Sequence, residues 1–147
     1  YDGDTVESVS IAKQPKFSMP AEGEICCGFS GDTLFYDSVM EDFRTHNGVD
    51  IASAGDSDVT AAADGVICDI YDGTLGKTVV LDHENGFKTV YANLDDTENL
   101  NVGTELKKGD FIAHVGTYSL GENTTQPHIH FEVIRDGEYV NPEDFLE

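Results

Sequence analysis

The chain has 147 residues, a length that suits one domain with a single hydrophobic core. Hydrophobic residues make up 39% and aromatic residues 10%, which argues against wholesale disorder. Acidic residues outnumber basic ones by 29 to 8, giving a formal net charge of −21. This charge opposes nonspecific attraction to nucleic acid and to anionic lipid, and favours a divalent metal, a cationic partner or simple solubility. No apolar run of about eighteen residues is present, so any membrane anchor is expected upstream of Tyr1.

The first 21 residues differ in composition from those that follow. They are polar, include Pro15 and Pro20, and show little periodicity, which predicts an N-terminal arm or linker over residues 1–21. Residues 22–147 are expected to form the folded domain. At its start, strands are predicted over 24–29 and 34–36, and a single helical turn over 38–43.

After residue 46 the sequence is rich in short β-strand signals. The expected strands cover residues 59–63, 66–71, 78–83, 87–91, 111–116, 128–134 and 139–140. Turn pairs such as Asp64-Gly65, Asn85-Gly86 and Asp136-Gly137 separate several of them. Short strands with turns every eight to twelve residues or so are typical of a mainly β fold, an antiparallel sheet or sandwich, and not of alternating βαβ units.

Two short motifs carry the candidate chemistry. His128 and His130 are two residues apart, so on a β-strand both rings project from the same face. His46 and Asp50 could add an imidazole and a carboxylate from a loop loosened by Gly48. Neutral imidazoles and one carboxylate with an open fourth position describe a catalytic zinc site. Either motif alone also fits an exposed pair without a ligand, but the two together favour Zn²⁺.

The remaining histidines and the cysteines have no ligand spacing. His83 is expected at a solvent-exposed turn, and His114 could face either the site or solvent. Cys26, Cys27 and Cys68 are expected to be buried or partly buried free thiols, because cysteine behaves as a small hydrophobe. Vicinal cysteines seldom form a disulfide with each other. A disulfide between Cys68 and either Cys26 or Cys27 is compatible with the sequence.

Seven segments match a known family pattern in the same order. They are His46-Asn-Gly-Val-Asp50-Ile-Ala, Ala61-Ala-Ala-Asp-Gly-Val66, Val80-Leu-Asp-His-Glu-Asn-Gly86 with Thr89-Val-Tyr91, Val102-Gly103, Lys107-Lys-Gly109 with Gly116, Pro127-His-Ile-His-Phe-Glu132, and Asn141-Pro142 with Phe145-Leu146. Over residues 22–147 the chain thus resembles the M23 (lysostaphin-type, LytM-like) zinc metallopeptidases. The resemblance implies the LytM, duplicated-hybrid-motif-like fold and action on peptidoglycan peptides.

The resemblance also implies a role for each site residue. His46, Asp50 and His130 would be the three zinc ligands, with a water of lowered pKa in the fourth position. His128 would be one of two catalytic histidines that hold this water and the oxyanion. The second belongs to the family's Y-x-H-L segment, where this chain has Asn93. Asparagine forms hydrogen bonds but takes up no proton, so we expect zinc to bind and hydrolysis to be impaired.

The combination of Asn93 with all three zinc ligands resembles the pattern of the stage II sporulation protein Q subfamily. That similarity implies an extracytoplasmic location in the cell envelope, a membrane anchor outside this chain, and an envelope partner protein. Three hypotheses stay open: a zinc metallopeptidase of peptidoglycan, a non-catalytic zinc-stabilised scaffold that binds a partner, and an acidic binding module without metal.

Overall fold

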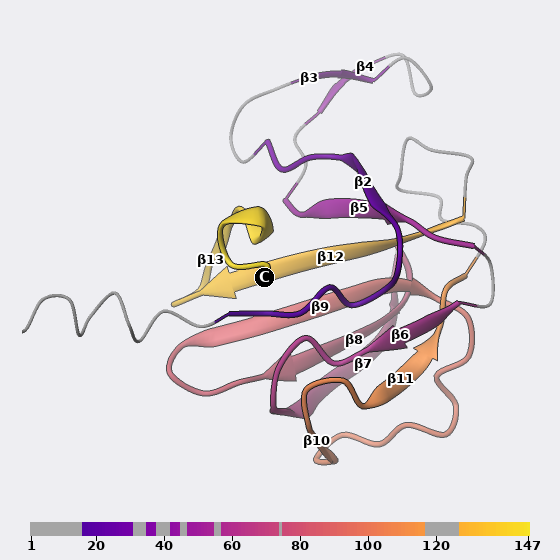
Figure 1. Cartoon of the computed structure of the whole chain (residues 1–147), viewed down its shortest axis with the longest axis vertical. Helices are drawn as coiled ribbons and strands as arrows, with labels where there is room; N and C mark the ends of the chain where they lie inside the picture. Colours follow the sequence, from indigo (N-terminus) through magenta and orange to yellow (C-terminus); the bar gives the residue numbers. More distant parts are fainter. Residues whose placement is uncertain are drawn as a thin grey trace, which may run out of the picture.

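Antiparallel β-strands dominate the computed structural model of the chain, which describes residues 16–30, 35–37, 42–44, 47–54, 57–73, 75–116 and 127–147 (Figure 1). The strands are β2 (Glu24–Cys27), β3 (Phe35–Asp37), β4 (Asp42–Arg44), β5 (Val49–Ala52), β6 (Asp58–Thr60), β7 (Gly65–Gly73), β8 (Gly76–Asp82), β9 (Phe87–Leu94), β10 (Glu105–Leu106), β11 (Phe111–His114), β12 (His128–Arg135) and β13 (Glu138–Val140). A short 3-10 helix, η1 (Pro142–Asp144), follows them. The mainly β, antiparallel fold predicted from the sequence is confirmed.

One large sheet organises the molecule. Its strand order is β10-β7-β8-β9-β12-β5-β2, and β13 pairs with β12 as the eighth strand. Two smaller pairings, β11 with β6 and β3 with β4, complete the topology. The predicted turns lie where the sequence placed them, with left-handed backbone at Asn85 (φ 56°) and Asp136 (φ 51°). Asparagine, aspartate and glycine tolerate that backbone, which explains the positions of these hairpins.

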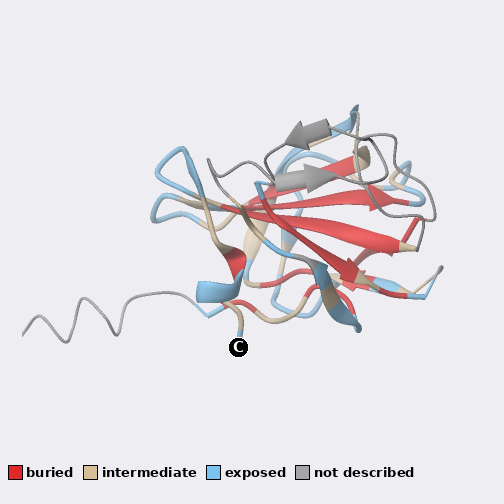
Figure 2. Ribbon diagram, turned by 90° about the horizontal axis from the view of Figure 1, so that it is seen from above, coloured by how far each residue is buried: buried red, intermediate tan, exposed pale blue. Residues whose placement is uncertain are grey.

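The hydrophobic core lies on one face of the large sheet. Inward-facing side chains of the sheet include Ile51, Leu81, Tyr91, Ile129 and Phe131, and the residues that cover them include Phe17, Val59, Ala61, Ile112, Val115 and Phe145. The covering layer therefore comes from residues 17–21, β6, β11 and the C-terminal end. Figure 2 shows the buried strands at the centre of the molecule and the exposed turns around it.

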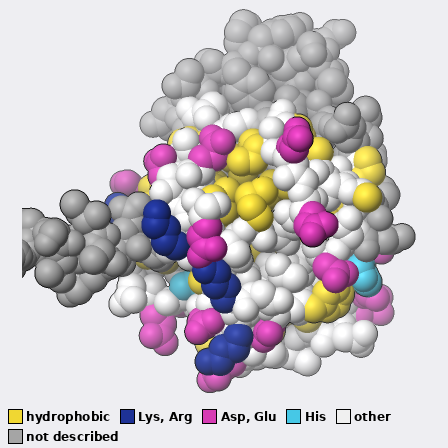
Figure 3. All heavy atoms as spheres, viewed as in Figure 1, with side chains coloured by type: hydrophobic (Ala, Val, Ile, Leu, Met, Phe, Trp, Pro, Cys, Tyr) yellow, Lys and Arg dark blue, Asp and Glu magenta, His cyan; other side chains and the backbone are white. Residues whose placement is uncertain are grey.

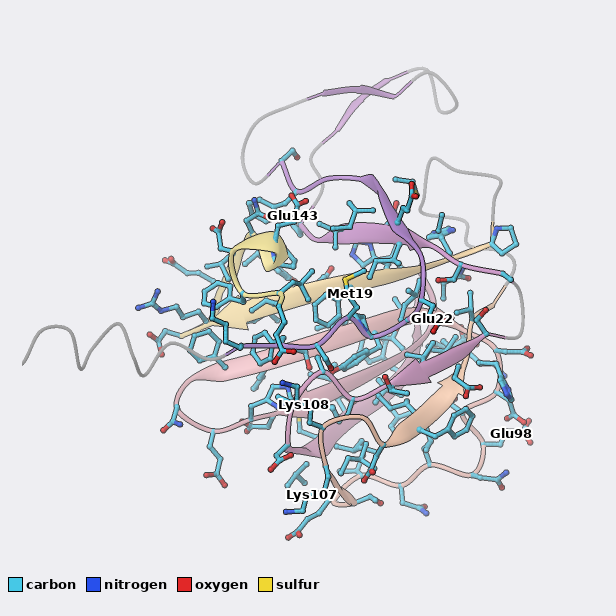
Figure 4. All side chains as sticks on the ribbon, viewed as in Figure 1. Met19, Glu22, Glu98, Lys107, Lys108 and Glu143 are labelled. Carbon is cyan, nitrogen blue, oxygen red and sulfur yellow. The ribbon has the colours of Figure 1, made fainter. Side chains whose placement is uncertain are left out.

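Phe17 anchors the first described segment to this core. Its side chain is fully buried, and its backbone N–H donates to the carbonyl of Phe145 at 2.8 Å. The arm boundary at residue 21 stays a prediction, but residues 17–21 pack on the core. Figure 4 shows Met19 and Glu22 on this same segment, which leads into β2.

The opposite face of the large sheet carries the polar residues of interest. Because side chains alternate along a strand, Asp50 on β5 and His128, His130 and Glu132 on β12 face away from the core. Cross-strand register places Ala92 beside His130 and Val90 beside Glu132 on this same face. A single sheet thus separates the hydrophobic core from the candidate site.

The structure limits one sequence prediction, the helical turn within residues 38–43. Asp42–Arg44 forms a strand paired with β3, so residues 42 and 43 do not belong to a helical turn; residues 38–41 lie outside the described residues. Among the helical residues that the structure describes, no segment is long and apolar enough to cross a membrane. On the face viewed in Figure 3, Asp and Glu side chains are widely spread, and Lys and Arg gather on one side.

Candidate metal centre

Asp50 and His130 form the centre of the candidate site. They lie 80 positions apart in the sequence, but β5 and β12 pair them directly in antiparallel register. Nδ1 of His130 lies 3.0 Å from Oδ1 of Asp50. The Asp50 side chain is 0% exposed and that of His130 is 2% exposed. Burial of a carboxylate and an imidazole side by side, away from the core, is typical of a metal or catalytic site.

Glu132 contacts the other nitrogen of the same ring. Its Oε2 lies 2.9 Å from Nε2 of His130, and it too is buried. With Nε2–H donating to Glu132, the nitrogen left to bind a metal is Nδ1, on the side of Asp50. In the sequence Glu132 ends the Pro127-His-Ile-His-Phe-Glu132 motif, and no role was predicted for it. Its alternation with His130 on one strand was the signal that could have found it.

His128 lies on the same face of β12, one strand repeat before His130. It is 1% exposed and pairs across the sheet with Ala52. The predicted H-x-H arrangement on a strand is therefore present. His46 lies outside the described residues, and within the part of the chain that is described no three His, Cys, Asp or Glu side chains are grouped to hold a metal. The described donors, a carboxylate and an imidazole, are those that zinc prefers.

Asn93 lies beside His128 at the end of β9. It is 1% exposed and has a left-handed backbone, with φ 65°. Its Nδ2 donates to the backbone carbonyl of His128 at 2.6 Å and lies 3.4 Å from that of Gly116. The structure thus brings together Asp50, His128, His130 and Asn93, four of the five site residues expected from the sequence.

Gly48 is required for close packing of the loop that precedes Asp50. A Cβ added there would lie 2.3 Å from the backbone oxygen of Phe131, on β12. The sequence suggested that Gly48 makes this loop flexible, but the structure gives a different reason for the glycine. Close approach of the two backbones is what excludes a side chain.

Two exposed tyrosines lie near Glu132. Tyr71 and Tyr139 are each 47% exposed. The negative charge of Glu132 is the main cause that raises the pKa of Tyr139; for Tyr71, burial raises the pKa most and Glu132 adds to it. The negative charge of Glu132, which contacts His130, therefore acts on both phenols.

The other titratable residues noted in the sequence lie away from this site. His83 is half-buried, not exposed: Nδ1 lies 2.6 Å from the Asp64 carbonyl and Nε2 lies 2.7 Å from Oγ1 of Thr89. His114 lies at the surface, with Nε2 3.7 Å from Oδ1 of Asp58. Cys26 and Cys68 are exposed, so the expectation of buried thiols is wrong for both; the Cys27 side chain lies outside the described residues.

Comparison with known proteins decides the family. The model of "Peptidase family M23" matches residues 44–142, which include every residue of the candidate site. The chain belongs to peptidase family M23. Among the M23 relatives by sequence, the DD-carboxypeptidase/endopeptidase Mpg of Neisseria meningitidis is 33% identical over 105 residues, covering 71% of this chain and 23% of Mpg. Stage II sporulation protein Q of Bacillus subtilis is 31% identical over 108 residues, covering 71% of this chain and 38% of that protein.

Solved structures show the same fold in this M23 domain. A zinc containing peptidase from Vibrio cholerae is 28% identical, with a TM-score of 0.73 over 88% of this chain and 40% of the other. The SpoIIQ-SpoIIIAH pore forming complex gives a TM-score of 0.77 at 24% identity, over 92% and 93% of the two chains, a likeness of fold. The M23 domain spans about a quarter of the length of its first curated relative, Mpg.

Proposed function

We propose that residues 22–147 form a zinc-binding metallopeptidase domain that acts on peptidoglycan peptides, preceded by an arm at 1–21, and that catalysis is impaired by Asn93. The observation that carries this proposal is the buried Asp50–His130 pair, 3.0 Å apart, with Glu132 on the second nitrogen of His130. A buried ionisable cluster outside the core is costly unless a ligand or a metal uses it.

In this proposal His46, Asp50 and His130 hold zinc. Bound zinc supplies a water whose pKa is lowered to near 7. Glu132 fixes the ring of His130 so that Nδ1 faces the metal position. His128, buried on the same face, orients the attacking water and the oxygen of the scissile carbonyl. The excess of acidic groups in the chain also favours a divalent cation.

Asn93 accounts for the impairment. Its amide donates to the backbone oxygen of His128, and an amide takes up no proton. A positioned acid–base group contributes about 10²–10⁴-fold to rate. This corresponds to about 2.7–5.5 kcal/mol of barrier, so residual hydrolysis is expected to be slow.

Metal analysis and a cleavage assay test the proposal together. The purified domain is expected to bind about one zinc per chain, and His130→Ala and Asp50→Ala are expected to lose it. Digestion of purified peptidoglycan, followed by separation of the released peptides, measures hydrolysis beside an active M23 enzyme. Zinc binding without any cleavage by the wild-type chain or by Asn93→His, while the control enzyme cuts, contradicts the peptidase assignment.

A second function is favoured by the same asparagine. We propose as the alternative a non-catalytic, zinc-stabilised scaffold that binds a partner protein in a sporulation or cell-envelope complex, outside the cytoplasm. The likeness in sequence to stage II sporulation protein Q supports this alternative and its subfamily. The scaffold predicts that zinc raises the melting temperature although no peptide is cut. Identical melting curves with and without zinc contradict it.

A further inference from the structure

Asn93 occupies a bulge in the large sheet. The register of β8 and β9 pairs Lys77 with Leu94 and Val79 with Tyr91, so two residues of β9 oppose one residue of β8. Asn93 is the second of these two and takes the left-handed backbone, φ 65°. Asparagine adopts this conformation more readily than most residues. The bulge therefore turns the end of β9 away from regular pairing.

Beyond the bulge, the main chain of β9 changes partners. Pairing with β12 ends at Ala92 opposite His130, and Leu94 bridges Val115 instead. The amide of Gly116 donates to the carbonyl of Asn93 at 2.7 Å. The β9–β12 register reaches His130 and not His128, and the Nδ2 of Asn93 donates to the backbone carbonyl of His128 at 2.6 Å. One residue thus joins Gly116 through its backbone and His128 through its side chain.

Two glycines make room for this arrangement. A Cβ at Gly116 would lie 2.7 Å from the backbone oxygen of Asn93 and 3.3 Å from its Oδ1. A Cβ at Gly76, which has φ 90°, would lie 3.2 Å from the Cα of Asn93. Both glycines therefore leave room for the backbone of Asn93 at the bulge.

We propose that Asn93 is a positioning residue: it clasps Gly116 to the first residue of β12 and so fixes the backbone of His128. The clasp gives the buried amide of Asn93 a structural role at this position. The clasp itself requires no zinc; its bearing on catalysis, through the orientation of His128, rests on the proposed function. In an imidazole, Nδ1 is bonded to Cγ just as Nδ2 is in asparagine, so Asn93→His can keep this hydrogen bond.

Native-state hydrogen exchange, followed by NMR, tests the clasp. In Asn93→Gly, which keeps the left-handed backbone and removes the donor, the amides of Asp95, Gly116 and Ile129 are expected to exchange roughly tenfold faster or more. Amides in β7 and β8 are expected to keep their wild-type rates. Asn85→Gly is the matched control, because Asn85 has φ 56° at an exposed turn; it is expected to leave all three amides unchanged. Asn93→His is expected to retain most of the wild-type protection.

The outcomes separate the clasp from a general loss of stability and from the proposed function. Unchanged exchange at Gly116 and Ile129 overturns the clasp, as does an increase spread evenly over β7 and β8. If Asn93→Gly does not fold, the wild-type chain decides: the side-chain NH₂ of Asn93 must exchange much more slowly than that of Asn85, and equal rates overturn the clasp. Hydrolysis by Asn93→His bears on the peptidase assignment alone, whereas exchange bears on the clasp alone.

Discussion

Removal of the Glu132 carboxylate is expected to weaken zinc binding without unfolding the domain. Glu132 is a buried side chain whose Oε2 accepts from Nε2 of His130 at 2.9 Å. Loss of such a partner to a metal-binding histidine typically costs about 10–100-fold in metal affinity. This range equals about 1.4–2.7 kcal/mol of binding free energy. We expect Glu132→Ala to fall within it, and Glu132→Gln, which keeps an acceptor oxygen, to fall at its lower end.

Competition with a chromophoric chelator measures this change. The dissociation constant for zinc is compared among the wild type, Glu132→Ala, Glu132→Gln and a control, Glu138→Ala. Glu138 is an exposed carboxylate on β13, so its removal changes the net charge equally but touches no part of the site. Equal zinc affinity for Glu132→Ala and Glu138→Ala, in a domain whose wild type binds zinc, would refute the role of Glu132. Circular dichroism in the presence of a chelator checks that each variant remains folded.

Three further changes test the fold around the site. Phe17→Ala removes a fully buried ring and is expected to lower the free energy of unfolding, measured in urea, by about 3–5 kcal/mol. Phe111→Ala, at a ring 51% exposed, is the control and is expected to cost far less. Equal losses in the two variants contradict the packing of the first segment on the core. Gly48→Ala is expected to cost about 1–3 kcal/mol because its Cβ meets the β12 backbone, whereas Gly28→Ala, with nothing within 4 Å of the added Cβ, serves as its control in thermal melts. Burial lowers the pKa of His83, so below about pH 6.5 the folded chain binds fewer protons than the unfolded chain. The contribution of neutral His83 to the free energy of unfolding is therefore complete above about pH 6.5. It declines as the pH falls, until the pH passes the pKa of His83 in the folded chain. The stability advantage of the wild type over His83→Gln should shrink from pH 8 to pH 5, and a constant difference would contradict this account.

The strands were predictable because their signals are local. Alternating apolar residues bounded by Asp64-Gly65, Asn85-Gly86 and Asp136-Gly137 fix both the strand type and the turn positions. The face that carries His128 and His130 followed from the two-residue period of a strand. The helical prediction is wrong for residues 42 and 43 because a short mixed segment has no clear period, and β4 gains its conformation from pairing with β3.

The tertiary features could not be read from local pattern. The exposure of Cys68 and the burial of His83 depend on what packs across the sheet, which composition does not specify. The role of Asn93 depends on a bulge, and a bulge arises from the registers of two neighbouring strands together. From the motif alone Asn93 is a missing histidine, whereas in the structure its amide contacts the carbonyls of Gly116 and His128 on two other segments.

The pairing of Asp50 with His130 makes the site depend on the register of β5 and β12. These residues meet only because β5 lies against β12 in one particular alignment. A slip of one residue would turn Asp50 toward the core and leave Val49 or Ile51 beside His130. A cation bound by both side chains would therefore select the properly aligned sheet from its misaligned competitors. Metal binding during folding would thus stabilise the correct alignment of two strands whose paired residues lie 80 positions apart in the sequence.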